Sequence, residues 1–488
     1  MKKRSSPIEL NFGELPTLPS GWQWGQMANV ATDERNSIVD GPFGSNLKLN
    51  DYIDPPGVPV LTTANLRGDY GPSSVRYISQ SKFNQLKRSE VRGGDILVAK
   101  IGSCGLTGIY PEDMPSAIIP ANLLKITVHK DYSRKFIFHY LNSPVFSEFL
   151  KKIITATAQP AFNVTKFRML PMPLVCKQTQ DTIVAELEKQ LTRLEAGVAA
   201  LKRVQANLKR YRAAILKAAC EGRLVPTEAD LARKEGRSYE TGDQLLARIL
   251  TERRQKWQGR GKYKEPAAPE TANLQSLPEG WTRTGFEQLS DGTRHAIKAG
   301  PFGSTLKKSF YVATGFKIYG QEQVINGDPY FGDYFISPEL FNELKSCAVK
   351  PGDILISLVG TAGKVLILPE DCVPGIINPR LLKLSLNRTG VSTKFIKIVM
   401  ESAQTRAFFK LAAHGGTMEI LNFGILKSLP LPLPPLAEQK RIVAEVERRL
   451  SVVEEQEAVV AANLQRGNRL RQAILQRAFS GGLVYNGT

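Results

Sequence analysis

A glycine-rich pentapeptide, GPFGS, occurs twice in the chain, at Gly41–Ser45 and again at Gly300–Ser304. Glycine has no Cβ, so a loop built on it lets backbone N–H groups approach a ligand closely. In such a turn, the backbone and the hydroxyl of Ser45 or Ser304 would suit a phosphate group. A turn at a sheet edge, inherited by both copies, explains the same residues equally well. The sequence leaves both interpretations open.

Several catalytic motifs can be tested against the sequence, and all of them fail. DPPG at Asp54–Gly57 lacks the aromatic fourth residue with which adenine methyltransferases stack on a flipped base. VGTAGKV at Val359–Val365 places valine where a phosphate-binding loop needs Ser or Thr to hold magnesium. The four histidines and five dispersed cysteines show no metal-ligand spacing. We therefore expect neither catalysis nor a metal site in this chain.

The pentapeptide belongs to a repeat that spans nearly the whole chain. The matched pairs include LPSGW from Leu18 and LPEGW from Leu277, GDILVAKIGSCG from Gly94 and GDILISLVGTAG from Gly352, and RAAILKAACEGRLV from Arg212 and RQAILQRAFSGGLV from Arg471. All pairs keep one order and one offset to within a residue. The chain is therefore a tandem duplication.

Each half begins with short segments rich in strand-forming residues, separated by the turn-forming residues glycine, proline and asparagine. The runs are VPVLTT, GDILVAKI and LLKITV in the first half, and FKIYG, GDILISLV and LLKLSL in the second. Helical patches lie between them, which predicts an α/β (α+β) domain with a mixed sheet in each half.

Each half ends with a long helical segment. From Gln178 to Cys220 there is no proline and only one glycine, and apolar residues recur at steps of four and three. That spacing is typical of a seam for a partner helix, and the obvious partner is the other copy. We expect two long helices paired as an antiparallel coiled coil. The expected seam residues are Leu187, Leu191, Leu194, Val198, Leu201, Leu208, Val446, Leu450, Val453, Val460 and Leu464, with Gly467 weakening the second helix.

These patterns predict two duplicated domains separated by the paired helices. The expected boundaries are 1–177 for the first domain, 178–225 for the first long helix, 226–275 for a helical and basic linker, 276–435 for the second domain and 436–488 for the second long helix. The linker has no counterpart in the second half.

The net charge narrows the class of partner. Lys and Arg number 65 against 46 Asp and Glu, which gives +19 and a pI near 9.6. This surplus of positive charge points to a polyanionic partner.

The sequence also indicates the compartment. It has no run of about eighteen apolar residues that could span a bilayer, and no secretory signal. The five cysteines are odd in number and dispersed, which suits a reducing cytoplasm. We expect a cytoplasmic protein whose partner is double-stranded DNA, because two similar domains on one chain can read two different half-sites.

The chain resembles the specificity subunit of type I restriction–modification systems, and the resemblance spans almost its whole length. The residues that carry it are GPFGS and the GDIL segments in both halves, LPLPPLAEQKRIVAEVE from Leu429, LRQAILQRAFSGGLV from Leu470 and the central LLARILTERRQKW from Leu245. One departure is VCKQTQ at Val175–Gln180, where the second half has PPLAEQ.

The resemblance implies a non-catalytic subunit of a phage-defence complex. Each domain would be a target-recognition domain that reads one half of an asymmetric bipartite DNA site. The paired helices would dock two methyltransferase subunits, which bring S-adenosylmethionine and methylate adenine. Restriction subunits that use ATP and Mg²⁺ to translocate DNA would complete the assembly.

We expect the residues that recognise the DNA sequence to lie where the two halves differ, between the segments that match, such as GPFGS and GDIL. Asn and Gln suit adenine edges, Arg suits guanine and Glu suits cytosine. The candidates for DNA contact, as clusters, are Ser45, Lys48, Thr63, Asn65, Arg67, Lys100, Ser103, Gln159 and Asn163 in the first half, and Ser304, Lys307, Gln321, Glu322, Gln323, Thr361, Lys364, Thr417 and Asn422 in the second.

Two alternatives stay open on the sequence. The chain could be a two-headed scaffold for protein partners, whose binding would not respond to DNA sequence. It could also be a similar subunit of another phage-defence methylation system. An RNA-binding domain is disfavoured because no aromatic stacking signature of that class is present.

Overall fold

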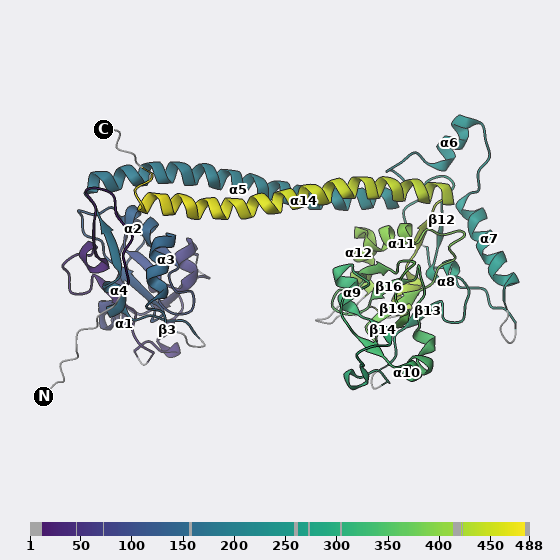
Figure 1. Ribbon diagram of the computed structural model, residues 1–488, viewed down its shortest axis with the longest axis horizontal. Coiled ribbons are helices and arrows are strands. Elements are labelled where there is room, and N and C mark those ends of the chain that lie inside the picture. The colour runs from purple at the N-terminus through teal and green to yellow at the C-terminus, as the bar shows by residue number, and fades with distance from the viewer. Residues whose placement is uncertain are drawn as a thin grey trace. The chain divides into compact units, whose positions relative to one another are not determined.

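The computed structural model describes residues 12–44, 46–71, 73–155, 159–257, 262–271, 274–302, 305–412, 421 and 423–483. The chain divides into two compact units, coloured by residue number in Figure 1. Unit 1 comprises Met1–Lys202 with Ala461–Thr488, and unit 2 comprises Arg203–Val460. Each unit therefore holds one α/β domain together with parts of both long helices, α5 (Lys177–Cys220) and α14 (Leu436–Phe479).

Unit 1 contains three antiparallel or mixed sheets, in the strand orders β1-β11, β2-β10-β7-β8 and β3-β5-β4-β9-β6, where β4 and β9 pair in parallel. Its strands are β1 (Gln23–Gln26), β2 (Ile38–Asp40), β3 (Tyr52–Ile53), β4 (Val58–Val60), β5 (Arg76–Ile78), β6 (Glu90–Val91), β7 (Ile96–Ala99), β8 (Thr107–Ile109), β9 (Ala117–Ile118), β10 (Leu123–Ile126) and β11 (Pro171–Leu174). Its helices are α1 (Gln80–Gln85), α2 (Arg134–Leu141), α3 (Pro144–Lys151) and α4 (Val164–Arg168), with short 3₁₀ helices η1 (Met27–Val30), η2 (Leu49–Asp51), η3 (Thr63–Arg67) and η4 (Lys87–Ser89).

Unit 2 repeats this plan in the strand orders β12-β20, β13-β19-β16-β17 and β15-β14-β18, where β14 and β18 are parallel. Its strands are β12 (Thr282–Thr284), β13 (Ile297–Ala299), β14 (Phe316–Tyr319), β15 (Phe335–Ile336), β16 (Ile354–Ser357), β17 (Val365–Ile367), β18 (Gly375–Ile377), β19 (Leu381–Leu384) and β20 (Leu431–Leu433). Its helices are α6 (Glu228–Glu235), α7 (Gly242–Gln255), α8 (Phe286–Leu289), α9 (Gln321–Asn326), α10 (Pro338–Glu343), α11 (Thr393–Glu401), α12 (Ala403–Ala412), α13 (Phe423–Ser428), η6 (Lys308–Phe310) and η7 (Lys345–Cys347). The expected β-rich runs are confirmed as β4, β7, β10, β14, β16 and β19.

The repeated GDIL segment owes its glycine and aspartate to a tight turn before a buried strand. Gly94 has a φ of +84° and Gly352 a φ of +80°, a region that favours glycine. The Asp95 carboxylate accepts hydrogen bonds from the Arg92 N–H at 2.9 Å and the Thr127 hydroxyl at 2.7 Å. It also pairs with Lys125 at 3.2 Å. Both residues of the motif are therefore structural.

The two hydrogen bonds to the aspartate recur in unit 2, whereas the matched Lys383 donates to the Ala348 carbonyl instead. The Asp353 carboxylate accepts hydrogen bonds from the Lys350 N–H at 2.9 Å and the Ser385 hydroxyl at 2.5 Å. Burial raises the pKa of Asp353 and lowers the pKa of the neighbouring Lys383. The internal network explains why the aspartate recurs without any catalytic role.

Helices α5 and α14 pack together, and in unit 1 their pairing runs antiparallel. Glu195 pairs with Arg471 at 2.7 Å, and three residues further along α5 the side chain of Val198 lies against Gly467. Gly467 is buried, so it does not interrupt the helix but lets Val198 approach the α14 backbone. A Cβ on Gly467 would lie 3.0 Å from a Val198 methyl.

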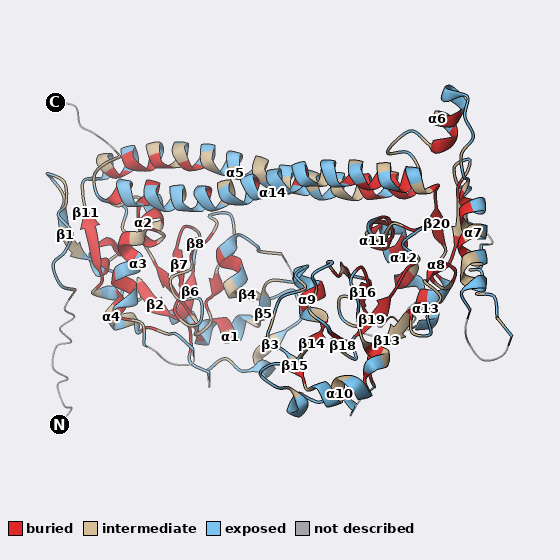
Figure 2. Ribbon diagram, turned by 45° about the vertical axis from the view of Figure 1, so that its right-hand side comes forward, coloured by how far each residue is buried: buried red, intermediate tan, exposed pale blue. Residues whose placement is uncertain are grey.

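In unit 2 the remaining parts of the two helices pair in the same way. Arg212 on α5 pairs with Glu454 at 3.2 Å and Glu457 at 3.4 Å on α14. Ile215 and Val446 lie in the same buried cluster. Figure 2 shows the outward faces of both helices as exposed.

None of the expected seam residues is exposed, which is consistent with a seam along both helices. Its buried members are Leu187, Leu191, Val446, Val453 and Val460, and its half-buried members are Leu194, Val198, Leu201, Leu208, Leu450 and Leu464. Helix α5 ends at Cys220, before the expected boundary at 225, because Gly222 turns left-handed with a φ of +66°.

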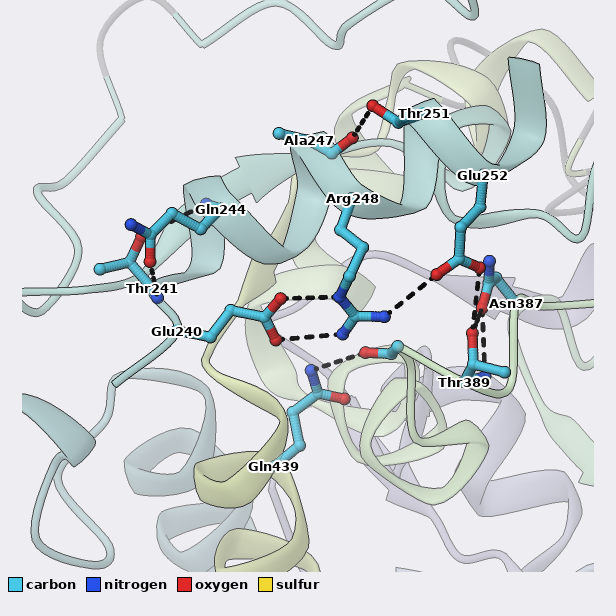
Figure 3. Close-up of polar contacts among 11 residues, drawn as sticks. Glu240, Thr241, Gln244, Ala247, Arg248, Thr251, Glu252, Asn387, Thr389 and Gln439 are labelled. Atoms are coloured by element: carbon cyan, nitrogen blue, oxygen red, sulfur yellow. Dashed lines mark hydrogen bonds and ion pairs between the residues drawn. The ribbon is translucent and has the colours of Figure 1, made fainter. Parts of the chain in front are cut away.

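The segment between the two halves is ordered on unit 2. Leu245 and Ile249 of α7 are fully buried in the core of that unit. On the polar side, Arg248 forms a two-pronged ion pair with Glu240 at 2.7 and 3.0 Å and a longer contact with Glu252 at 3.3 Å (Figure 3). Glu252 in turn accepts a hydrogen bond from Thr389 at 3.5 Å. Helix α7 is thus a packed part of unit 2.

This packing explains the one departure between the halves. The buried carboxylate of Glu438 accepts hydrogen bonds from the Trp281 indole at 2.9 Å and from the Glu228 N–H at 2.8 Å. Glu438 therefore holds the start of α6, whereas the first half has Thr179 at the matched position.

The start of both long helices is nevertheless held alike. Gln180 accepts a hydrogen bond from the Ser133 N–H at 2.8 Å and donates one to the Val175 carbonyl at 2.7 Å. Gln439 makes the same two bonds at 2.9 Å, with Ser392 and Pro434. The alignment of the two glutamines is confirmed.

Gly197 offers a test of the helix pair. It is exposed, helical and has open space where a Cβ would stand. Gly197→Ala should raise the free energy of unfolding by about 0.5–1 kcal/mol, because alanine loses less backbone entropy in a helix. Urea denaturation would measure the change. Gly467→Ala is the matched control, and its free energy of unfolding should rise less because the added methyl would meet Val198. Equal increases at both positions would contradict the close approach of Val198 to the α14 backbone.

Candidate nucleic-acid interface

Five turns of unit 1 converge into what we call the first loop cluster, formed by segments 41–44, 62–65, 100–103, 119–122 and 159–162. Backbone hydrogen bonds tie the segments together: the Lys100 N–H bonds to the Asn122 carbonyl at 2.7 Å, and the Gly102 N–H bonds to the Pro160 carbonyl at 2.8 Å. The Asn122 amide donates to the Thr63 hydroxyl at 3.0 Å. The expected clusters after GPFGS, after GDIL and around residue 160 therefore meet in one place.

Unit 2 builds an equivalent second loop cluster from segments 300–302, 320–323, 357–361, 378–380 and residue 421. The Leu358 N–H bonds to the Arg380 carbonyl at 2.9 Å, and the Leu421 N–H bonds to the Leu358 carbonyl at 2.8 Å. The Arg380 guanidinium donates to the Gln321 side chain at 3.3 Å, and Gln321 donates to the Ser357 hydroxyl at 2.9 Å.

The two clusters share a backbone frame but differ in polar side chains. Thr63 and Asn122 in unit 1 hold the positions of Gln321 and Arg380 in unit 2, at the same offset of 258 residues. Each pair is joined by a side-chain hydrogen bond. One frame thus presents a hydroxyl and an amide in the first cluster, and an amide and a guanidinium in the second.

Asn65 and Gln323 were expected among the exposed readers, and the structure corrects this. Asn65 is fully buried, accepts a hydrogen bond from the Thr62 N–H at 2.5 Å and donates to the Asp69 carbonyl at 2.5 Å. Gln323, at the matched position, is 1% exposed and accepts from the Gly320 N–H at 2.8 Å. Both amides hold the start of a short helix and have no free face for a ligand.

Lys100 was also expected to face a ligand, and this is wrong for a different reason. Its side chain is 8% exposed, and its ammonium pairs with the buried carboxylate of Asp40 at 2.6 Å. The ammonium also lies 5.3 Å from the centre of the Phe43 ring. Unit 2 has Ala299 and Leu358 at the positions of Asp40 and Lys100, so the ion pair belongs to the first unit's interior.

The other candidates within the described residues lie at the surface. Lys48, Arg67, Ser103, Gln159, Asn163, Lys307, Glu322 and Lys364 are exposed, and Thr63, Gln321 and Thr361 are half-buried. Asn163 also caps α4 by accepting a hydrogen bond from the Thr165 N–H at 2.6 Å. Ser45, Ser304, Thr417 and Asn422 lie outside the described residues.

The sequence analysis missed four residues of the loop clusters. Asn122 and Arg380 differ between matched segments, ANLL and PRLL, so the rule that selected the other candidates could have found them. Phe43 and Phe302, from the two GPFGS copies, are 62% and 87% exposed. Only burial, which the sequence does not show, distinguishes these two rings from core phenylalanines.

The first glycine of each GPFGS has a structural reason. A Cβ on Gly41 would lie under 3.0 Å from the Pro120 backbone, and one on Gly300 would overlap the Asn378 backbone. These contacts press the pentapeptide against the turn that carries Asn122 or Arg380. The interpretation as a tight turn at a sheet edge is therefore supported for this glycine. In contrast, Gly44 has open space around it.

Within the described parts of the chain, no three His, Cys, Asp or Glu side chains gather where they could hold a metal ion. A search of the same residues for a helix long and apolar enough to cross a membrane also found none.

Substituting Gly41 and Gly44 tests whether the close approach of the GPFGS backbone to the Pro120 turn is required. Gly41→Ala should lower the stability of unit 1 by about 1–3 kcal/mol, because its methyl would meet fixed backbone. Gly44→Ala is the matched control in the same loop and should change stability by less than about 0.5 kcal/mol. Thermal denaturation measures both. Equal effects would mean that the close approach of Gly41 to the Pro120 turn is not required.

The buried ion pair of unit 1 gives a second test. Lys100→Leu should cost about 3 kcal/mol, because Asp40 keeps a buried charge with only the half-exposed Arg88 at 3.2 Å. Adding Asp40→Ala recreates the Ala299 and Leu358 arrangement of unit 2 and should recover most of that loss. Urea denaturation of both variants checks this, and a double variant as unstable as the single one would refute it.

Comparison with known proteins agrees with the fold and with the duplication. The family model for the type I restriction modification DNA specificity domain matches residues 43–202 and 302–454, which is one copy in each half. The chain is 24% identical over 488 residues to the type I restriction enzyme EcoBI specificity subunit of Escherichia coli, covering 98% of this chain and 89% of the relative. It is 22% identical over 486 residues to the StySPI specificity subunit of Salmonella potsdam, covering 96% and 90%.

Among solved structures, the fold is similar to a chain from a study of complex assembly and conformational transition in the type I R-M system. The TM-score is 0.64 at 18% identity, and the match covers 96% of this chain and 99% of the other. With two family domains, full-length relatives and a shared fold, this chain belongs to the family of type I restriction–modification specificity subunits, the non-catalytic subunits that confer DNA specificity.

Proposed function

We propose that each unit reads one half of an asymmetric, bipartite DNA site through its loop cluster. The observation that carries this proposal is the exchange of polar side chains on a common frame, Thr63 with Asn122 in one cluster and Gln321 with Arg380 in the other. Two related domains that recognise different DNA sequences require a constant backbone whose polar side chains differ.

The chemistry of the exchanged residues favours different bases. A guanidinium such as that of Arg380 suits the two acceptors of guanine, and the amide of Asn122 suits adenine. Arg380 is exposed, so its guanidinium group is accessible to a ligand. We therefore expect a guanine within the word that unit 2 reads.

Affinity would come mainly from phosphate contacts. The net charge of +19 supplies the long-range attraction. Lys48 and Lys307 lie at matched positions just after the two GPFGS segments, and both are exposed. As cations retained in both halves, they suit contacts to the DNA backbone that do not depend on sequence.

The remaining parts of the proposal concern the assembly. The paired helices α5 and α14 would fix the length of the unread spacer and dock two methyltransferase subunits. Those subunits would bring S-adenosylmethionine and methylate an adenine in each half-site, and restriction subunits would use ATP and Mg²⁺. The support is the family membership and the exposed outer faces of the two helices.

Selection from randomised duplexes tests the reading of two words. The tagged chain, with the subunits that co-purify from its host, should enrich two different short words at one fixed spacing, at both low and high salt. The double variant Gln321→Thr/Arg380→Asn, which gives unit 2 the polar pair of unit 1, should change one word and leave the other word and the spacing unchanged.

Arg388→Gln serves as the matched control, because it removes an exposed cation of unit 2 that pairs with Glu370. It should weaken binding slightly and alter neither word. If no words are enriched and DNA is retained only at low salt, the proposal fails and a scaffold for protein partners takes its place.

A further inference from the structure

The two exposed phenylalanines of the loop clusters, Phe43 and Phe302, belong to none of the hydrophobic clusters among the described residues. Phe302 is 87% exposed, the highest value among the large apolar side chains that the structure describes, and Phe43 is 62% exposed. A phenyl ring left in water forgoes the stabilisation that burial provides. Two rings left out at matched positions of a duplicated frame point to a ligand that covers them.

Both rings are presented from a fixed base. The preceding glycines bond to the neighbouring strands, Gly41 to the Leu123 carbonyl at 3.2 Å and Gly300 to the Leu381 carbonyl at 3.0 Å. The residue after each glycine, Pro42 or Pro301, is buried. Each ring therefore projects from an anchored segment.

The turn that follows each ring is closed in the same way. The carbonyl of Phe43 accepts a hydrogen bond from the Asn46 N–H at 2.8 Å, and the carbonyl of Phe302 accepts one from the Thr305 N–H at 3.1 Å. The carbonyl of each phenylalanine is thus used within the chain, while its ring is exposed.

The nearest charged neighbour does not explain the rings. In unit 1 the Lys100 ammonium lies 5.3 Å from the centre of the Phe43 ring. In unit 2 the matched residue is Leu358, and the ring of Phe302 is more exposed still. An intramolecular cation–π contact therefore cannot be the common reason for both.

The comparison of the two clusters assigns the kind of contact. Positions that differ, such as Thr63 and Gln321, suit contacts that depend on the base sequence. Positions that are the same suit contacts that any DNA offers. A phenyl ring has no polar atom for phosphate, so its counterpart on DNA is the apolar face of a base.

We propose that Phe43 and Phe302 each insert at a base step within or beside a half-site, stack on one base and open the step. Apolar side chains from rigid loops act in this way when they kink a duplex. This inference rests on the proposed function, since it requires that each loop cluster binds DNA.

The experiment uses the duplex enriched in the selection above, with 2-aminopurine placed in turn at each position in and around both half-sites. Besides the target adenine, which a methyltransferase flips out of the duplex, binding of the purified assembly should increase the emission at one further step per half-site, because that step loses its stacking. Phe43→Ala should abolish the increase at one half-site and Phe302→Ala at the other. Each variant should weaken binding about tenfold, within the usual range for loss of one base–aromatic stack.

The conservative variants separate stacking from simple bulk. Phe→Tyr at either position should keep the signal, and Phe→Leu should keep only part of it. Leu15→Ala, which shortens an apolar residue 37% exposed in the segment before β1, away from the loop clusters and the long helices, is the control and should change nothing.

Two outcomes would overturn the inference while leaving the proposed function intact. One is sequence-selective binding by the alanine variants with unchanged affinity and emission. The other is unchanged DNA binding combined with loss of a co-purifying subunit, which would place the rings against protein. Failure of the unaltered chain to select any word would instead refute the proposed function itself.

Discussion

The structure depends on one constraint: the last turns of each long helix complete the core of the unit formed by the other half of the chain. In unit 1, Phe479 of α14 lies between Phe136 and Tyr140, with ring centres 5.2 and 5.3 Å away. In unit 2, Ala219 of α5 is fully buried in the cluster that contains Phe395. Neither half of the sequence therefore contains a complete core, and antiparallel pairing is enforced at both ends.

The residues with which the two long helices complete the cores differ in size, and so do the residues around them. Phe479 and Trp24 of unit 1 correspond to Cys220 and Arg283 of unit 2. In unit 1, Trp24 packs on Phe149 with ring centres 5.6 Å apart. In unit 2, Cys220 and Arg283 are among the residues that line a groove of about 590 Å³. The frame thus tolerates large changes of volume while its backbone contacts stay the same.

The sequence predicted the architecture well because a repeat is a long-range signal. The strands, the paired helices and their seam follow from periodicity and from the constant offset. The sequence analysis named the polar clusters separately, and their meeting in one place comes from the backbone hydrogen bonds between the turns. The packing of α7 on unit 2 did not follow, because the pattern of Leu245 and Ile249 shows an apolar face but not what covers it.

Individual site residues were harder to predict, for a physical reason. An amide such as that of Asn65 or Gln323 can hold a helix start or face a ligand, and composition does not distinguish the two. Lys100 is buried because Asp40, sixty positions earlier, lies beside it, a contact that no local pattern reveals. Asn122 was overlooked because its segment reads as a strand start.

The asymmetry between the halves lies in what each one must connect to. A duplicated chain has to lead from the end of α5 to the second domain, and the segment that does so binds to Glu438 through the Glu228 N–H and to the core through Leu245. The first half has Thr179 at the position of Glu438. The shared backbone thus varies where the two domains are joined and in the polar side chains of the loop clusters. It is the same where backbone packs against backbone, at Gly41 and Gly300.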